Sequence, residues 1–467
     1  MKRQKITSSE LLCAICFALC FFAFMLTEAF INERCAVILG SSAVNPVYTF
    51  GLVCTGLGFF SFSLLRRLCK KEKSRKTAQT ILGILCIGAA MVLLFANQPA
   101  LFLTSSSAAL LLTGHISGCV YYNTAMYFAG SRYTGRLIGT GMGAAILLQF
   151  VVQNLIPQSV TFIISILFSV AFVMYFIMKA PKDWILENPL PYSSDAKKDF
   201  KKTLLLIVAV VLMSLVAGMI DSVLTAFNAE KSYDIYGGVR LFYALGLILA
   251  GFLADIKERK YLPLSTVCTI LLSSVCMFFL SDEVSYFAGT ALMYLYSGFY
   301  VIFFTVMFLD FAPKSGNPEL WAGMGRIVRS FTVAATVLPA LTIYDAVGNT
   351  VLAVVSCLLS ILILLVLLPY LSNAAVSLKP IEELISGSPE LSPQERLKLF
   401  AQYCSLTPRE TEVLEKLLTT EDGVQEIADS LYISRRMVQR YISSIYEKTE
   451  TKTRLGLFQS YMNFTAK

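Results

Sequence analysis

The chain has 467 residues, of which 56% are hydrophobic and only 15% are charged, and its formal net charge is +8. A soluble globular domain carries about 25% charged residues and about 45–50% apolar ones. This composition excludes a disordered chain, a collagen-like fibre, a disulfide-rich secreted scaffold and an ordinary soluble enzyme, and it favours a membrane protein. The 12 cysteines lie mostly inside apolar runs, so we interpret them as small buried hydrophobic residues rather than disulfides or metal ligands.

Apolar runs of about 20 residues, long enough to cross a ~30 Å hydrocarbon core as helices, recur along the first 372 residues. We predict twelve membrane-spanning helices: 11–31, 46–65, 78–96, 105–128, 137–156, 159–178, 203–225, 236–256, 261–280, 285–309, 322–343 and 350–371. Buried helices of a large soluble core are the alternative, but they would leave too little polar surface to cover them. The long connection 179–202 divides the runs into six plus six, which suggests two repeated halves.

Lysine and arginine gather in alternate connections. If the N-terminus is cytoplasmic, the cytoplasmic connections hold Lys2, Arg3, Lys5, Arg66, Arg67, Lys70, Lys71, Lys73, Arg75, Lys76, Arg132, Arg136, Lys179, Lys182, Lys197, Lys198, Lys201, Lys202, Lys257, Arg259, Lys260, Lys314 and Arg326. The opposite connections hold little more than Arg34 and Lys231. This asymmetry predicts a multi-pass membrane protein with both termini in the cytoplasm. We interpret the first run as a retained helix and not a signal peptide.

Polar side chains inside apolar runs are costly and therefore informative. Glu28 and Asp221 lie in the outer third of the first and seventh runs, which the six-plus-six repeat relates. Arg240 lies at comparable depth and could neutralise Asp221, and His115 lies near the middle of the fourth run. We interpret these four residues as candidate contacts of a small-molecule ligand in a cavity between the halves. Hydrogen bonding between helices is the alternative interpretation.

The composition changes at about residue 372. Three parts are predicted: a membrane domain at 1–372, a cytoplasmic linker at 373–402 and a soluble helical domain at 403–467. In the last part, Thr407, Pro408 and Glu410 form a capping box with a helix-starting proline.

A second short helix is predicted over 424–431, a third one after the cap residue Ser434, and a fourth at about 453–462. The third helix presents a basic exposed face of Arg435, Arg436, Gln439, Arg440 and Ser443. Two short helices joined by a tight turn, the second with such a face, are typical of a helix-turn-helix. Judged by charge alone, this face could equally be a solvent-exposed basic surface of a small helical bundle that does not bind DNA.

The strings LTPRE, EIADSLYIS and VQRYISSIYEK resemble the LuxR-type helix-turn-helix over about 60 residues in unbroken register. The resemblance implies that the third helix enters the major groove of DNA and that the fourth pairs two subunits into a homodimer. It places Gln439, Arg440 and Ser443 on the base-reading face, and Gln425, Arg435 and Arg436 at the DNA backbone, with Ser434 at the helix start.

The tail departs from the family pattern at four positions, Met437, Gln439, Tyr441 and Thr449, which alter the sequence preference without breaking the helices. No receiver domain precedes the tail, so we do not expect aspartyl phosphorylation as the input.

The six-plus-six architecture resembles the major facilitator superfamily. The segment GFLADIKERK, Gly251 to Lys260, looks like that family's loop signature, whose motif residues here are Gly251, Asp255 and Arg259. The resemblance implies that Asp255 interacts with a neighbouring helix end. The equivalent place in the first half has Phe62 at the Asp position, which puts active transport in doubt. The predicted fold class is therefore an all-α polytopic membrane protein, transporter-like, followed by a four-helix LuxR-type domain.

The best interpretation is a membrane-embedded one-component transcription regulator whose partners are DNA, membrane lipid and an unknown small molecule. A secondary transporter with a regulatory tail is the main alternative, and a tail that only binds proteins is another. The sequence offers no nucleophile with a base, no nucleotide loop and no metal cluster, so we predict no enzyme, no metal and no cofactor.

Overall fold

The computed structural model describes residues 8–69, 71–129, 131–156, 159–179, 196–229, 234–257, 259–279, 283–375, 393–420, 422–449, 451 and 453–462. The chain divides into two compact units, Met1–Ala375 and Val376–Lys467, and each has its own hydrophobic core. Every regular element among the described residues is helical.

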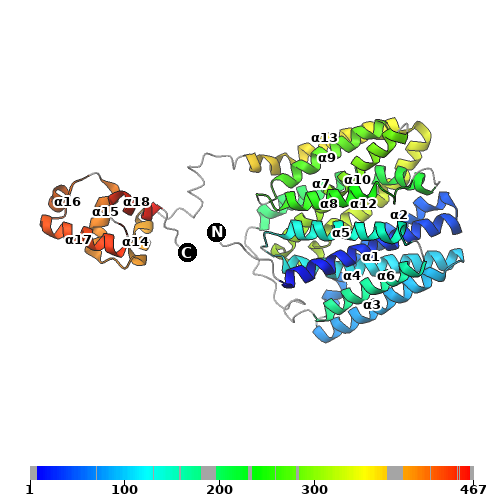
Figure 1. Cartoon of the computed structure of the whole chain (residues 1–467), viewed down its shortest axis with the longest axis horizontal. Helices are drawn as coiled ribbons and strands as arrows, with labels where there is room; N and C mark the ends of the chain where they lie inside the picture. Colours follow the sequence, from blue (N-terminus) through cyan, green and yellow to red (C-terminus); the bar gives the residue numbers. More distant parts are fainter. Residues whose placement is uncertain are drawn as a thin grey trace. The chain divides into compact units, whose positions relative to one another are not determined.

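The first unit is a bundle of long helices that lie side by side (Figure 1). Its α-helices are α1 Ser8–Ile38, α2 Val44–Leu68, α3 Glu72–Phe95, α4 Pro99–Tyr127, α5 Thr134–Asn154, α6 Ser159–Lys179, α7 Ala196–Ala229, α8 Arg240–Ala254, α9 Tyr261–Cys276, α10 Glu283–Phe311, α11 Pro318–Trp321, α12 Met324–Val347 and α13 Asn349–Ala375. Short 3-10 turns follow α1, α9 and α10 at Ser41–Ala43, Met277–Phe279 and Ala312–Lys314.

Ten helices in the described part of the chain are long and apolar enough to cross a membrane. The eighth and ninth predicted runs instead form the shorter apolar helices α8, with 15 residues, and α9, with 16. A 15-residue helix is about 23 Å long, less than the ~30 Å hydrocarbon core. The shortening has local causes, because turns occupy 235–239 before α8, around Gly237 and Gly238, and a 3-10 turn follows α9.

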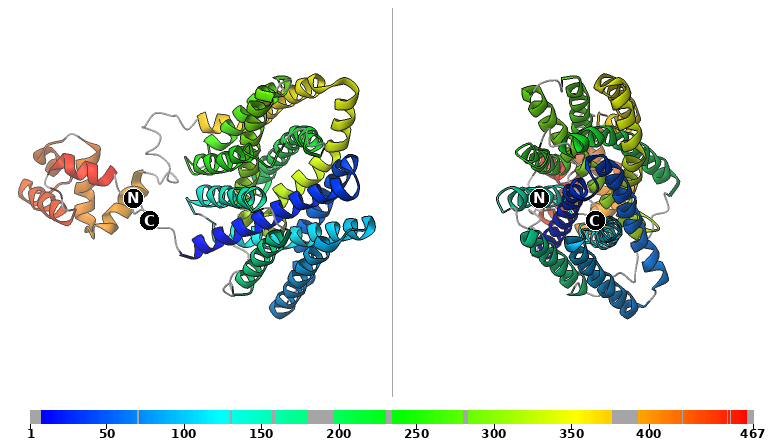
Figure 2. Two further views of the ribbon diagram at one scale, coloured as in Figure 1. Left: turned by 45° about the vertical axis from the view of Figure 1, so that its right-hand side comes forward. Right: turned by 90° about the vertical axis from the view of Figure 1, so that its right-hand side faces the viewer.

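Helices α1–α6 form one half of the bundle and α7–α13 the other, and the two halves meet where α5 packs on α8 and α2 packs on α12. Figure 2 shows the bundle from two further directions. A side chain at Gly139 of α5 would lie 2.6 Å from the Leu247 carbonyl oxygen and 2.7 Å from the Gly251 Cα atom of α8. These glycines therefore allow the two backbones to touch.

The described part of the second unit contains five helices: α14 Pro393–Tyr403, α15 Pro408–Thr419, α16 Val424–Ser430, α17 Arg435–Lys448 and α18 Arg454–Met462. Their shared core is built from Phe400, Val413, Leu414, Leu417, Ile427, Ala428, Val438, Ile445 and Leu457. Helix α14 begins within the range 373–402 that was predicted as linker and ends one residue beyond it, yet its Phe400 is buried in this core. The prediction of an all-α polytopic membrane protein followed by a small helical domain is confirmed.

Candidate ligand cavity and nucleic-acid interface

A polar cavity lies between the two halves of the membrane bundle. Three of the four predicted ligand residues line it: Glu28 on α1, Asp221 on α7 and Arg240 on α8. The cavity offers about 70 Å³ of space to the centres of water-sized molecules. Its remaining walls come from Met25, Asn32, Tyr48, Ala217, Leu224, Thr225, Ile235, Tyr236, Tyr243, Tyr294, Ser297, Tyr300, Val301 and Arg329.

Asp221 is held by two partners from both halves of the bundle. The Tyr48 hydroxyl donates a hydrogen bond to Asp221 Oδ2 at 3.0 Å, and Arg329 Nη2 lies 3.3 Å from the same oxygen. The sequence left Arg240 as the residue that could neutralise Asp221. In the structure Arg329 takes that place, because α12 packs against α7 and directs its guanidinium at the carboxylate.

Arg240 is surrounded by tyrosines. Its guanidinium carbon lies 5.4 Å from the ring centroids of Tyr236, Tyr243 and Tyr294. Nη1 donates to the Tyr294 hydroxyl at 3.4 Å, and Nη2 donates to Gln149 Oε1 at 3.3 Å. The side chain is buried, and its Nε has no hydrogen-bond partner. Among the described residues, no carboxylate forms an ion pair with Arg240.

Glu28 is half-buried and lines the same cavity. In the part of the chain that the structure describes, its carboxylate accepts no hydrogen bond and forms no ion pair. The cavity therefore contains one paired carboxylate, Asp221, and one unpaired carboxylate, Glu28.

His115 is separate from this cavity. Its Nδ1 lies 2.8 Å from the Ser61 hydroxyl and its Nε2 lies 3.3 Å from Gln79 Nε2. The Phe62 ring packs edge-on against the imidazole, with centroids 5.9 Å apart. These contacts tie α4 to α2 and α3, which fits the interhelical alternative better than ligand contact.

The cavity residues that sequence reasoning missed include both partners of Asp221, Tyr48 and Arg329. Arg329 had a signal, because an arginine inside the predicted run 322–343 is as costly there as the residues that were chosen. Arg326, one turn earlier, was assigned to a cytoplasmic connection, and this placement is wrong. It is buried within α12, where it donates to the Tyr121 hydroxyl at 2.9 Å and lies 5.2 Å from the rings of Phe21 and Phe304.

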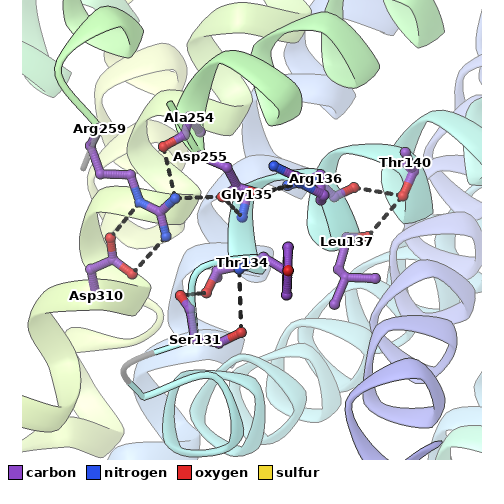
Figure 3. A network of polar contacts seen from close by, with 11 residues as sticks. Ser131, Thr134, Gly135, Arg136, Leu137, Thr140, Ala254, Asp255, Arg259 and Asp310 are labelled. Atoms are coloured by element: carbon purple, nitrogen blue, oxygen red, sulfur yellow. Dashed lines mark hydrogen bonds and ion pairs between the residues drawn. The ribbon is translucent and has the colours of Figure 1, made fainter. Parts of the chain in front are cut away.

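The signature residue Asp255 joins the two halves at the end of α8 (Figure 3). Its carboxylate accepts hydrogen bonds from the backbone N–H groups of Gly135 and Arg136, at 2.8 and 2.9 Å, and from Arg136 Nε at 2.9 Å. Those two N–H groups lie in the first turn of α5, where the helix itself supplies no acceptor for them. Asp255 therefore caps a helix of the other half.

Arg259 extends the Asp255 network within the second half. It donates to Asp255 Oδ1 at 2.6 Å and to the Ala254 carbonyl at 2.7 Å, and its Nε lies 2.7 Å from Asp310 Oδ2. Gly251 is the signature glycine that packs on α5. The three signature residues therefore act together at one α5–α8 junction.

The equivalent junction of the first half is built differently. Phe62 packs among aromatic rings, against His115 and Tyr122, instead of capping a helix. Arg67 at the end of α2 instead donates to Asn317 Oδ1 at 2.9 Å and lies 3.9 Å from Glu319 Oε1. The two halves thus have one buried network and one looser, more exposed contact.

In the C-terminal unit, side-chain caps that were predicted from the sequence mark the start of helices α15 and α17. Thr407 Oγ1 accepts from Glu410 N, and Glu410 Oε2 accepts from Thr407 N at 2.7 Å, which completes the predicted capping box. Ser434 caps α17 by accepting from Met437 N at 3.4 Å. The short helix α16 and the longer α17 follow each other around a turn at Tyr432, where φ is +53°.

Helix α17 has one buried face and one exposed face. Val438 and Ile445 point into the core. The exposed side carries every residue that the sequence placed on the DNA-binding face of this helix: Ser434, Arg435, Arg436, Gln439, Arg440 and Ser443. Gln425 on α16 is also exposed, and its amide donates to Asp429 Oδ1 at 3.0 Å. Three arginines, Gln439 and Ser443 thus face solvent from α17, and the cap residue Ser434 is exposed at its start.

An ion pair between the buried carboxylate of Glu410 and the partly exposed Lys448 joins α15 to α17. Lys448 Nζ lies 2.7 Å from Glu410 Oε2, and the Ser444 hydroxyl donates to Glu410 Oε1 at 2.6 Å. Burial raises the pKa of Glu410, but the hydrogen bonds from Lys448, Ser444 and Thr407 outweigh it and lower the pKa to about 2. The carboxylate is therefore charged at any physiological pH and holds the exposed face of α17 in place.

The match of this unit to a known family decides its nature. Residues 404–460 match the family of bacterial regulatory proteins described as the luxR family. The C-terminal unit carries a LuxR-family DNA-binding domain. The predicted resemblance is confirmed over the helices α15, α16, α17 and α18, whose order and caps are described above.

The membrane unit has the fold of a major facilitator transporter. It is similar to the crystal structure of the human organic anion transporter MFSD10 (TETRAN), with a TM-score of 0.56 and 13% sequence identity. The match covers 77% of this chain and 98% of that one. At this identity the likeness shows the fold alone. No curated protein matches the chain.

Proposed function

We propose that this protein is a membrane-embedded one-component transcription regulator. Its membrane domain senses a small molecule, and its LuxR-type domain binds promoter DNA. The observation that carries the proposal is the presence, on one chain, of a LuxR-family domain and a transporter-like bundle with a polar cavity. We propose the boundaries 1–372, 373–402 and 403–467, an inner-membrane location and cytoplasmic termini.

The proposed input is a change in the relation between the two halves of the bundle. Cavity residues come from α1 and α2 in the first half and from α7, α8, α10 and α12 in the second. The Asp255 network fastens the same halves together at the α5–α8 junction. A ligand that prefers one arrangement of the halves shifts the population toward it, by as much as its affinity differs between the arrangements. Helix α13 ends the bundle and leads to the tail.

The proposed output is DNA binding through α17. Gln439, Arg440 and Ser443 would read base edges in the major groove, while Gln425, Arg435 and Arg436 would contact the phosphates. Exposure of all six supports this assignment. Pairing of two tails through α18 would let a homodimer bind two half-sites.

A binding assay with the full chain tests the proposal. The protein in lipid nanodiscs is mixed with DNA fragments from its own gene neighbourhood, and complexes are detected by mobility shift. Discrete complexes that disappear in the double variant Arg436→Ala, Arg440→Ala are expected. Failure of every fragment to bind, or equal binding by the variant, would contradict the proposal and favour a protein-interaction role for the tail.

A secondary transporter is the second candidate, favoured by the fold and by the intact signature at Asp255. Phe62 at the equivalent position argues against it. Two measurements in the same cells separate the regulator from the transporter: transcription of a reporter gene and accumulation of the substrate. A regulator loses ligand-dependent transcription when Arg436 and Arg440 are replaced, whereas a transporter with a dispensable tail still accumulates its substrate in those cells.

A further inference from the structure

We propose that the cavity between the halves binds a small zwitterion, a molecule that carries a carboxylate and an ammonium group, as an α-amino acid does. This inference rests on the proposed sensing function and names its ligand class. The juxtaposition that carries it is an arginine and a glutamate in the walls of one cavity, neither of which forms an ion pair with a described residue.

Of the four charged side chains in the cavity walls, only two form an ion pair with each other. Asp221 and Arg329 form an ion pair with each other, which leaves Glu28 and Arg240. Neither of these two has an ion-pair partner among the described residues. A charge held away from water without a partner is unfavourable, and a ligand that supplies the partner removes that cost. The complementary ligand therefore carries both charges and is neutral overall.

Arg240 is suited to a carboxylate. It is only 7% exposed, its Nε has no hydrogen-bond partner, and its hydrogen bonds to Tyr294 and Gln149 are long, at 3.4 and 3.3 Å. A guanidinium has five N–H donors in a planar fork, and two of those of Arg240 donate to Tyr294 and Gln149. A carboxylate matches that fork with two parallel hydrogen bonds, which a neutral acceptor does not.

Glu28 is suited to the ammonium group, because its carboxylate lines the cavity and accepts no hydrogen bond within the described chain. The tyrosines around Arg240 provide flat walls for the rest of the ligand. The space for water-sized centres, about 70 Å³, fits several water molecules and so limits the ligand to a small molecule.

The test uses the full chain in nanodiscs and three matched probe sets. Each set holds an amino acid, the acid that lacks its ammonium group and the amine that lacks its carboxylate: alanine, propionate and ethylamine; leucine, 4-methylpentanoate and isopentylamine; phenylalanine, 3-phenylpropionate and 2-phenylethylamine. Affinity is read from the thermal unfolding shift across a concentration series. At least one amino acid is expected to bind about tenfold or more tightly than both partners of its set.

Two variants assign the two charges. Arg240→Gln is expected to make the zwitterion bind no better than the amine, and Glu28→Gln to make it bind no better than the acid. Arg240→Lys keeps the charge but not the fork, and is expected to keep part of the preference. The matched controls are Arg326→Gln, which removes a buried arginine outside the cavity, and Glu33→Gln, which removes an exposed carboxylate of the same helix.

The wild-type comparison alone can overturn the proposal, even if a variant does not fold. Zwitterions that bind no better than acids or amines, or that give no shift in any set, would overturn it. This failure is distinct from that of the proposed function, since promoter binding would still be seen. Conversely, zwitterion binding that leaves promoter binding unchanged would retain the cavity assignment and remove the sensing role.

Discussion

Asp255 accepts hydrogen bonds from both the backbone N–H and the side-chain Nε of Arg136, each at 2.9 Å, across the junction of the two halves. The Asp255 side chain is fully buried, whereas that of Arg136 is 37% exposed. The carboxylate is therefore the centre of the network, and Arg136 is its more exposed partner.

Replacement of Asp255 by Asn should loosen this junction. The amide keeps the shape but offers one acceptor oxygen in place of two and removes the charge that faces the α5 N-terminus. We expect the bundle to lose about 1–3 kcal/mol of stability, measured by thermal unfolding in nanodiscs, and the ligand response of a reporter to shift. Asp310→Asn, at the edge of the network, is the control and should have a smaller effect. Equal effects of the two would contradict the central role of Asp255.

The pair Asp221–Arg329 should behave as a coupled unit. Asp221→Asn leaves Arg329 without its ion-pair partner, and Arg329→Gln leaves Asp221 without its ion-pair partner. The destabilisations of the two single variants should therefore add up to more than the destabilisation of the double variant. A double-mutant cycle on thermal unfolding is expected to give a coupling energy of about 1–3 kcal/mol. A coupling near zero would mean that the 3.3 Å contact contributes little.

Arg436 and Arg440 on α17 should contribute to DNA affinity mainly through phosphates. Each Arg→Ala change is expected to weaken binding and to reduce the salt slope by about one unit per lost phosphate contact. Titration of a promoter fragment at several salt concentrations measures both. Arg409→Ala is the control, because that exposed arginine lies on α15 and pairs with Glu412.

Gln439 should act on sequence preference. A glutamine can hydrogen-bond a base edge in the major groove, and its side chain is exposed on α17. Gln439→Ala is expected to change the ranking of operator variants more than the affinity for non-specific DNA, measured by competition with a randomised operator library. An unchanged ranking would remove Gln439 from the base-reading face.

Glu410 should make the C-terminal domain sensitive to acid. Its pKa is about 2 in the folded state against an ordinary 4.5, so its stabilising contribution is full above pH 4.5 and is lost as the pH falls toward 2. Glu410→Gln is expected to cost about 1.5–3 kcal/mol at neutral pH and to flatten this dependence. Urea unfolding of a fragment from residue 388, which contains the whole core, measures it. Glu412→Gln, an exposed position, should change stability by less than about 0.5 kcal/mol.

Much of the architecture could be predicted, because hydropathy and caps are local properties of the chain. The apolar runs, the capping box at Thr407 and the cap at Ser434 each depend on residues within a few positions of one another. The lengths of α8 and α9 could not be predicted, because an apolar run does not show where turns interrupt it.

The sequence predicted three of the charged residues that line the cavity, but not which of them form ion pairs. Glu28, Asp221 and Arg240 stand out as polar residues inside apolar runs, and the structure brings them to one cavity. Which arginine meets Asp221 depends on how α7 packs on α12, a tertiary contact that the sequence does not show. His115 stands out equally in sequence, yet its ring is occupied by Ser61 and Gln79.

The most direct test of the central claim is chromatin immunoprecipitation of the tagged full chain from cells with intact membranes. We predict discrete DNA sites that co-purify with the membrane-bound protein and that are lost when Arg436 and Arg440 are replaced by Ala. Enrichment no greater for the wild-type chain than for that double variant would contradict the account.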